Sequence, residues 1–185
     1  MKKRQILIIS IITLIVSINA NAQDPIFTKE DKVLNFGVGF GSLHYGGSGF
    51  SMQVPPISVS FEKGIVDNIA EKGAIGIGGY MGYASYAWKD WGWKSSFSNF
   101  VIGARGNFHY PIIEKLDTYS GIFIGYEFVK WKDTYQGGTN NNLSTSGGIW
   151  AWHVGGRYYF NEKISGIAEL GYGITYVTIG IGVKF

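Results

Sequence analysis

The sequence predicts an all-β protein, a transmembrane β-barrel of eight antiparallel strands in up-and-down order. First, apolar residues alternate with small or polar residues along short segments, as expected where successive side chains of a strand point to opposite faces. Second, glycine supplies 28 of 185 residues and aromatic residues 16%, whereas charged residues supply only 16%, against about 25% in a soluble domain. Third, residues 23–185 contain no apolar run long enough for a spanning helix, which a barrel does not need because its strands satisfy one another's backbone groups.

The first 22 residues have the pattern of an export signal. Residues 2–4 are basic, residues 6–18 form an apolar core, and residues 20–22 are small enough for a cleavage site. The apolar core is well short of the roughly 20 residues that a spanning helix requires. We therefore expect a cleaved signal peptide at residues 1–22 and one barrel domain at residues 23–185.

Charge and cysteine content exclude several classes of partner and site. The net charge of +3 comes entirely from residues 2–4, so residues 23–185 carry 13 basic and 13 acidic side chains. This balance provides no field to attract nucleic acid. The chain has no cysteine, which excludes disulfides, thiolate metal sites and acylation of an N-terminal cysteine. The three histidines lack paired ligand spacing, so we expect no metal and no cofactor.

Eight segments carry the alternating pattern, each with one bulky apolar face. They span about residues 32–42, 55–63, 73–86, 98–110, 118–131, 148–160, 164–172 and 175–185. In the first four, the bulky faces are Leu34, Phe36, Val38 and Phe40; Ile57, Val59 and Phe61; Ile75, Ile77, Met81 and Tyr83; and Phe100, Ile102, Ala104, Phe108 and Tyr110. The opposite faces are rich in glycine, serine and asparagine.

The second four segments repeat this arrangement. Their bulky faces are Ile122, Ile124, Tyr126 and Phe128; Trp150, Trp152, Val154, Tyr158 and Phe160; Ala168, Leu170 and Tyr172; and Val177, Ile179, Ile181, Val183 and Phe185. We expect the bulky face to contact lipid and the glycine-rich face to line a narrow lumen. A soluble sandwich or lipocalin-like barrel is the rival fold, but it would have to turn the large aromatic residues inward.

The connections between segments are of two kinds. Three contain Glu-Lys, at residues 61–64, 113–116 and 161–164, and we expect them to be short periplasmic turns. The connections at residues 43–54, 87–97 and 132–147 are longer and rich in Gly, Ser, Asn and Trp, as the external loops of membrane barrels are. With an even number of strands, both termini are then periplasmic.

These features together resemble a known family. The alternation, the Gly-Tyr pairs at residues 79–80, 125–126 and 171–172, and the terminal Phe185 resemble the small eight-stranded outer-membrane barrels of the OmpA-transmembrane-domain, OmpX and OmpW type. The resemblance covers residues 32–185. It implies a monomer in the outer membrane of a Gram-negative bacterium, in contact with lipid. It also implies assembly by the barrel-assembly machinery, which would read Ile181, Val183 and Phe185.

Four charged residues on the predicted lumen face indicate a polar network. Arg105, Glu127, Arg157 and Glu169 lie on successive strands, so we expect pairs between Arg105 and Glu127, Glu127 and Arg157, and Arg157 and Glu169. Buried charges must be paired because an isolated one costs several kcal/mol. The network would be a structural plug, and the alternative interpretation is a narrow path for ions or small solutes.

The tryptophans suggest where a partner could bind. Trp88, Trp91, Trp93 and Trp131 belong to the predicted outer loops or their edges, where they form either an interfacial girdle or a surface that stacks on a glycan or a protein. Ser42 and Ser146 with His44 and His153 show no catalytic spacing, so we expect no enzyme. The predicted function is structural or surface-interacting through the extracellular loops. The alternative is a narrow porin or OmpW-like channel for small or apolar solutes.

Overall fold

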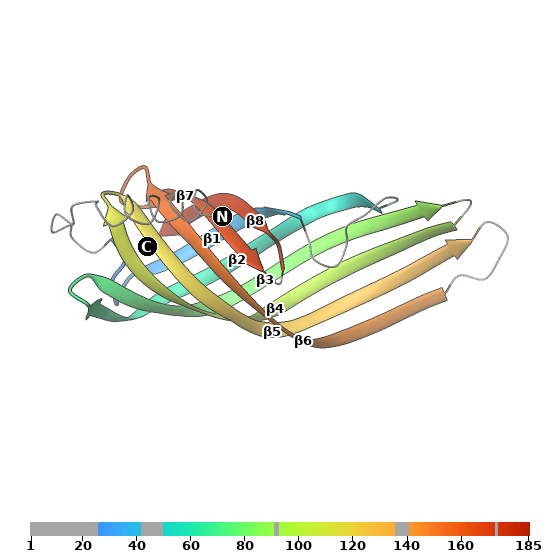
Figure 1. Cartoon of the computed structure of the whole chain (residues 1–185), viewed down its shortest axis with the longest axis horizontal. Coiled ribbons are helices and arrows are strands. Elements are labelled where there is room, and N and C mark those ends of the chain that lie inside the picture. Colours follow the sequence, from blue (N-terminus) through green and yellow to red (C-terminus); the bar gives the residue numbers. More distant parts are fainter. Residues whose placement is uncertain (1–25, 42–49, 91–92, 136–140, 173) are drawn as a thin grey trace, which may run out of the picture.

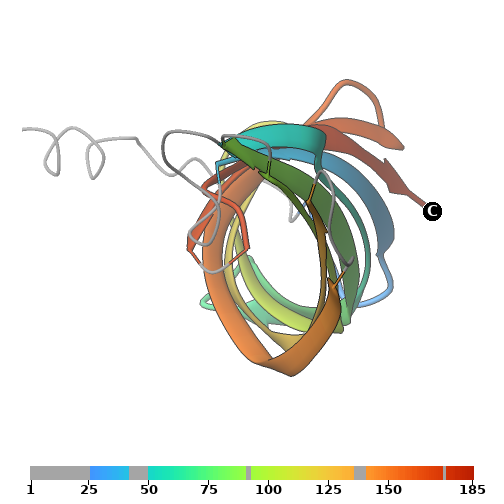
Figure 2. The ribbon, with the colours of Figure 1, turned by 90° about the vertical axis from the view of Figure 1, so that its right-hand side faces the viewer.

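The computed structural model describes residues 26–41, 50–90, 93–135, 141–172 and 174–185, and its eight antiparallel strands close into one barrel in up-and-down order (Figures 1 and 2). The strands are β1 (Lys32–Phe40), β2 (Phe50–Ile69), β3 (Gly73–Asp90), β4 (Trp93–Ile113), β5 (Leu116–Tyr135), β6 (Asn141–Tyr159), β7 (Ile164–Tyr172) and β8 (Val177–Lys184). The fold class is therefore as predicted. Within the described ranges, no helix is long and apolar enough to cross a membrane. The predicted signal peptide lies outside these ranges.

The two faces of the strands are also as predicted. In β1, Val33 and Asn35 are buried on the lumen side, whereas Phe36 and Phe40 are each 48% exposed on the outside. The same contrast holds in β5, where Phe123 is buried and its neighbour Ile124 is 68% exposed. An apolar exterior around a polar interior is the reverse of a soluble barrel and matches a hydrocarbon surrounding.

The strands differ greatly in length. β1, β7 and β8 have 8 or 9 residues, but β2 to β6 have 18 to 21. At a rise of about 3.3 Å per residue, nine residues cover roughly 30 Å, the thickness of a hydrocarbon core. Twenty residues cover about 66 Å by the same rise. Five strands are therefore about twice as long as a bilayer requires.

Most of the excess length lies at one end of the barrel. β6 pairs with β7 only from Trp152↔Tyr172 to Tyr159↔Ser165, so residues 141–151 have no described partner strand on that side. We call residues 50–56, 84–90, 93–99, 127–135 and 141–149 the extension. It is a five-stranded sheet that continues beyond the closed barrel, away from the marked C-terminus (Figure 1). We call the opposite end, with the short turns, the turn end.

The predicted long loops were largely wrong. β2 already begins at Phe50, β3 runs to Asp90 and β4 starts at Trp93, while β5 reaches Tyr135 and β6 starts at Asn141. Outside a membrane, a strand needs no bulky apolar face, although its backbone groups still pair with their neighbours. The apolar period that marked the strands therefore fades before the strands end.

One predicted turn was also displaced. The Glu-Lys pair at residues 62–63 lies inside β2, and the β2–β3 turn falls at residues 70–72. Bulges in the pairing between Gly64 and Ile69 break the two-residue period of this strand. Apolar and polar residues therefore stop alternating after Phe61, and this loss of the pattern led to the prediction that the strand ends near residue 63.

Candidate functional site

The turn-end half of the lumen contains a layer of four charged side chains. The Arg157 Nη2 group donates to Glu62 Oε2 at 2.9 Å, and its Nε lies 3.0 Å from Asp117 Oδ2. His109 Nε2 lies 2.7 Å from Glu62 Oε1, and its Nδ1 lies 2.9 Å from Asp117 Oδ1. All four residues are nearly or fully buried. The layer ties β6 to β2 on the far side of the barrel, and also joins β4 and β5.

The partners of His109 determine its protonation. A carboxylate only accepts hydrogen bonds, so both ring nitrogens must donate and the ring is an imidazolium. The Arg157 Nη2 group also approaches Nδ1, but at 3.3 Å it is farther away than the Asp117 oxygen. The layer then has two positive and two negative charges and no net charge.

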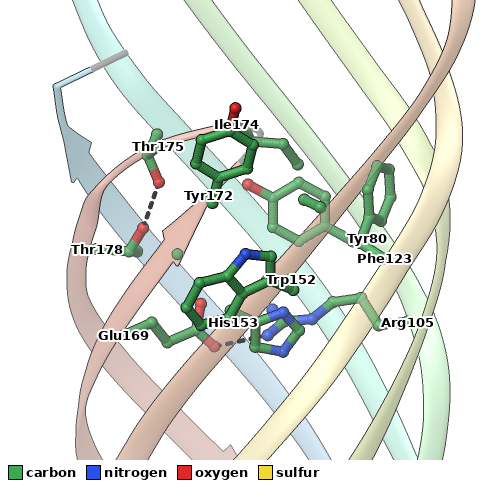
Figure 3. Close-up of a pocket in the computed structure, with 12 residues that line it drawn as sticks. Tyr80, Arg105, Phe123, Trp152, His153, Glu169, Tyr172, Ile174, Thr175 and Thr178 are labelled. Carbon is green, nitrogen blue, oxygen red and sulfur yellow. Dashed lines mark hydrogen bonds and ion pairs between the residues drawn. The ribbon is translucent and has the colours of Figure 1, made fainter. Parts of the chain in front are cut away.

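A second layer lies nearer the extension. Arg105 Nη2 donates to Glu169 Oε1 at 2.7 Å, and the Tyr119 hydroxyl donates to the same oxygen at 2.8 Å. Figure 3 shows the Arg105–Glu169 pair beside His153. Asn107 connects the layers, because its Nδ2 donates to Glu62 Oε1 while its Oδ1 lies 2.8 Å from His153 Nε2.

The pairs differ from those expected. Arg105 pairs with Glu169 across the lumen rather than with Glu127, and Arg157 pairs with Glu62 and Asp117. Glu127 is level with Val101, four residues or about 13 Å along β4 from Arg105, and it accepts from Asn99 Nδ2 at 2.5 Å. The sequence predicts which strands are neighbours. It does not predict the register between them, which sets how far along the barrel each side chain lies.

Apolar groups close the lumen on both sides of these layers. Phe27, only 2% exposed, stacks on His109 with ring centroids 4.1 Å apart, and the Arg157 guanidinium lies 5.1 Å from the Phe27 centroid. Toward the extension, Tyr80 and Phe123 meet edge to face at 5.4 Å. The cavity between the Arg105–Glu169 layer and these rings (Figure 3) measures about 30 Å³. It has room for little more than a water molecule.

The interior contains features that the sequence analysis missed. Asp117 lies between the predicted turn at residues 113–116 and the predicted start of the fifth segment at residue 118, so it belongs to neither predicted element. Phe27 precedes every predicted strand and showed no pattern at all. Among the described residues, no group of three or more His, Cys, Asp or Glu could hold a metal ion.

The predicted tryptophan surface is only partly described. Trp131 belongs to the extension and is 42% exposed; its Nε1 donates to Asp133 Oδ1 at 2.5 Å, and its ring lies 4.7 Å from that of Phe97. Trp88 is half-buried on β3. Trp91 lies outside the described residues, and Trp93 is the first residue of β4.

The predicted assembly residues lie at the seam of the barrel. Ile181 pairs with Phe36 and Val183 with Leu34, where β8 meets β1. The Phe185 backbone N–H donates to Lys32 O at 3.0 Å, and its ring is 63% exposed.

No protein-family model matches the sequence, and no curated protein matches it. Solved structures do match. A major outer membrane protein of Thermus thermophilus aligns with a TM-score of 0.58 at 11% identity, covering 84% of this chain and 99% of that one. The fold is that of the small outer-membrane β-barrels.

Two further structures share this outer-membrane barrel fold. Ail of Yersinia pestis aligns with a TM-score of 0.53 at 12% identity, over 85% of this chain and 100% of that one. OprG of Pseudomonas aeruginosa aligns with a TM-score of 0.52 at 13% identity, over 88% and 99%. Ail has also been solved in complex with the heparin analogue sucrose octasulfate. At these identities the likeness concerns the fold.

Proposed function

We propose that this chain is a closed, monomeric barrel of a Gram-negative outer membrane that presents the extension to an extracellular partner. The apolar exterior and the outer-membrane barrel fold support the location. The short turns at one end support a periplasmic turn end, because such barrels keep short turns on that side. The signal peptide, and the reading of Ile181, Val183 and Phe185 by the assembly machinery, are part of the same proposal.

The length of β2 to β6 is the observation that carries the proposal. A bilayer accounts for about half of each strand, so the rest must have another use. The extension holds Trp131 beside Asp133, and Ser95 Oγ donates to the same Asp133 oxygen at 2.5 Å. An exposed indole next to carboxylate and hydroxyl groups can stack on a sugar and hydrogen-bond its hydroxyls. The β6 edge at residues 141–151, which has no partner strand toward β7 in the described part of the chain, could alternatively accept an extended strand of a protein.

The partner class is therefore a glycan or a protein. The Ail complex shows that another barrel of this fold accommodates a sulfated sugar analogue, and we extend that possibility to this chain. A glycan array that includes sulfated glycans, together with binding to extracellular-matrix proteins, would identify the partner class.

Replacing Trp131 with Ala tests the surface. We expect binding to fall at least tenfold, because an aromatic platform contributes a large part of such contacts. Trp152→Ala is the matched control, since Trp152 is 46% exposed on the outside of the barrel at the level of Tyr172. Equal binding by both variants and the parent would refute the role of the Trp131 surface.

The filled lumen favours this function over the alternative of a narrow channel. Phe27, the two charged layers and the Tyr80–Phe123 pair follow one another along the axis. A solute path does not fit such an interior, and our proposal includes no enzymatic activity. The polar network then serves structure, as a plug that holds opposite walls together.

A further inference from the structure

The outer face of the barrel changes from apolar to polar where the extension begins. Phe100 and Phe128 pair across β4 and β5 and are 38% and 44% exposed on the outside. Beyond this level, the described outward side chains of β4 to β6 are all polar: Ser96, Ser98, Lys130, Lys132, Asn142, Ser144 and Ser146. Such residues belong in water and not in hydrocarbon.

The inner face of the extension, which continues the lumen face, carries apolar side chains instead. From Phe123 to Asp133, β5 turns every second residue inward, because no bulge interrupts its pairing with β6. Trp131 and its β6 partner Leu143 lie on this face and are 42% and 63% exposed. A Cβ at Gly147, on the same face of β6, would meet no atom within 4 Å. This part of the inner face is therefore accessible to a partner.

Two carboxylates lie on the inner face, at opposite ends of its β5 segment. Asp133 Oδ1 accepts hydrogen bonds from Ser95 Oγ and Trp131 Nε1, and Glu127 Oε1 accepts one from Asn99 Nδ2. Among the described residues, the second oxygen of each carboxylate has no hydrogen-bond partner and neither carboxylate forms an ion pair. Asn99 Oδ1 is a further acceptor that is buried without a partner in this part of the chain. The inner face thus offers negative charge and unused acceptors.

Charge therefore distinguishes the two faces of β5. Lys130 and Lys132 are exposed on the outer face, whereas Glu127 and Asp133 alternate with them on the inner face. A sulfated glycan would be attracted to the outer face and repelled from the inner one, because complementary charges meet at an interface and like charges exclude each other. A partner that contacts Trp131 on the inner face must accordingly be basic.

We propose that the inner face of the extension binds a basic, extended segment of a protein. At about 3.3 Å per residue, the six residues from Glu127 to Asp133 span roughly 20 Å. A segment laid along β5 has the same two-residue period, so basic side chains six residues apart reach both carboxylates. Two apolar side chains between them contact Val129 and Trp131. A small organic cation would meet only one carboxylate. The proposal rests on the proposed function, in which the extension faces an extracellular partner, and names the class of that partner.

Calorimetric titration of the full barrel in phosphatidylcholine nanodiscs tests this face. The probe is the end-blocked peptide Lys-Thr-Val-Thr-Val-Thr-Lys, which should bind at least tenfold more tightly than Glu-Thr-Val-Thr-Val-Thr-Glu. Glu127→Gln with Asp133→Asn should remove this preference. Asp133→Asn alone should weaken binding of the basic peptide severalfold and remains informative where the double variant does not fold. Lys130→Gln with Lys132→Gln, on the outer face of the same strand, is the matched control and should bind the basic peptide within twofold of the parent.

Other outcomes separate this proposal from the proposed function. Equal binding of the two peptides, or unchanged binding of the basic peptide by the folded Glu127/Asp133 variant, would overturn the proposal. Binding of sucrose octasulfate that is lost in Trp131→Ala would assign the surface to a glycan; it would overturn the basic partner and support the proposed function. Binding of the basic peptide that requires both carboxylates but not Trp131 would support the basic partner and refute the role of the Trp131 surface.

Discussion

Among single residues, Arg157 stabilises the barrel because it links strands on opposite walls. It is fully buried on β6, contacts Glu62 on β2 and Asp117 on β5, and lies above the Phe27 ring. The cost of removing one member of a buried charged group is mainly that of the charge left behind. The stability of this layer therefore depends on its neutrality more than on any single contact.

Arg157→Met should accordingly destabilise the barrel by about 3–5 kcal/mol, since it leaves an unbalanced carboxylate in the lumen. Adding Glu62→Gln restores neutrality, with His109 still facing Asp117, and should recover a large part of the loss. Urea unfolding from lipid vesicles measures both effects. A double variant no more stable than Arg157→Met would contradict the charge-balance argument.

At the scale of elements, the closeness of strand backbones at the β8–β1 seam depends on glycine. A Cβ at Gly180 would collide with the backbone carbonyl of Phe36, whose carbon would lie 2.8 Å away. A Cβ at Gly106 on β4 would meet no atom within 4 Å. Glycine is thus required at one of these two positions and only tolerated at the other.

Gly180→Ala should lower the stability of the barrel by about 1–3 kcal/mol, the usual cost of overpacking, because β8 must shift against β1. Gly106→Ala should leave it unchanged or slightly raised. The fraction that migrates as folded barrel in unheated SDS gels, followed against temperature, reports both. Equal thermal behaviour of the two variants would contradict the required close approach.

The elements also show what a single sequence can predict. Alternation revealed all eight strands and their lipid-facing sides, because hydrocarbon demands a bulky apolar residue at every second position. It could not reveal the extension, where that demand is absent, nor the bulges of β2. The sequence did not reveal the register between strands either. It therefore predicted some of the residues of the lumen network but not the pairs that they form. Phe27 lies outside every periodic segment. Its role in closing the lumen becomes visible only in the folded barrel.

In the molecule as a whole, side chains fill the interior of the barrel and leave no pore. Apolar caps lie on both sides of the two charged layers, and those layers carry Arg105, His109 and Arg157 against Glu62, Asp117 and Glu169. The three positive and three negative charges cancel, so the two layers together carry no net charge that would attract either sign of ion.

Planar bilayers containing the purified barrel should therefore show no steady conductance. Phe27→Ala should also remain silent, because both charged layers persist behind the lost cap. A stable ohmic current from the parent protein would refute the plug and revive the narrow-channel alternative. A current from Phe27→Ala alone would show that Phe27 is the seal and the layers are not.

The unequal strand lengths give this end of the molecule a preferred direction of approach. β7, β8 and β1 end early, whereas β2 to β6 continue beyond them as a curved sheet on one side of the barrel (Figure 1). In the described part of the chain, a molecule that settles on this rim therefore meets a wall of strands on one flank only. It would approach sideways, parallel to the membrane surface, and its orientation would be set before any specific contact forms.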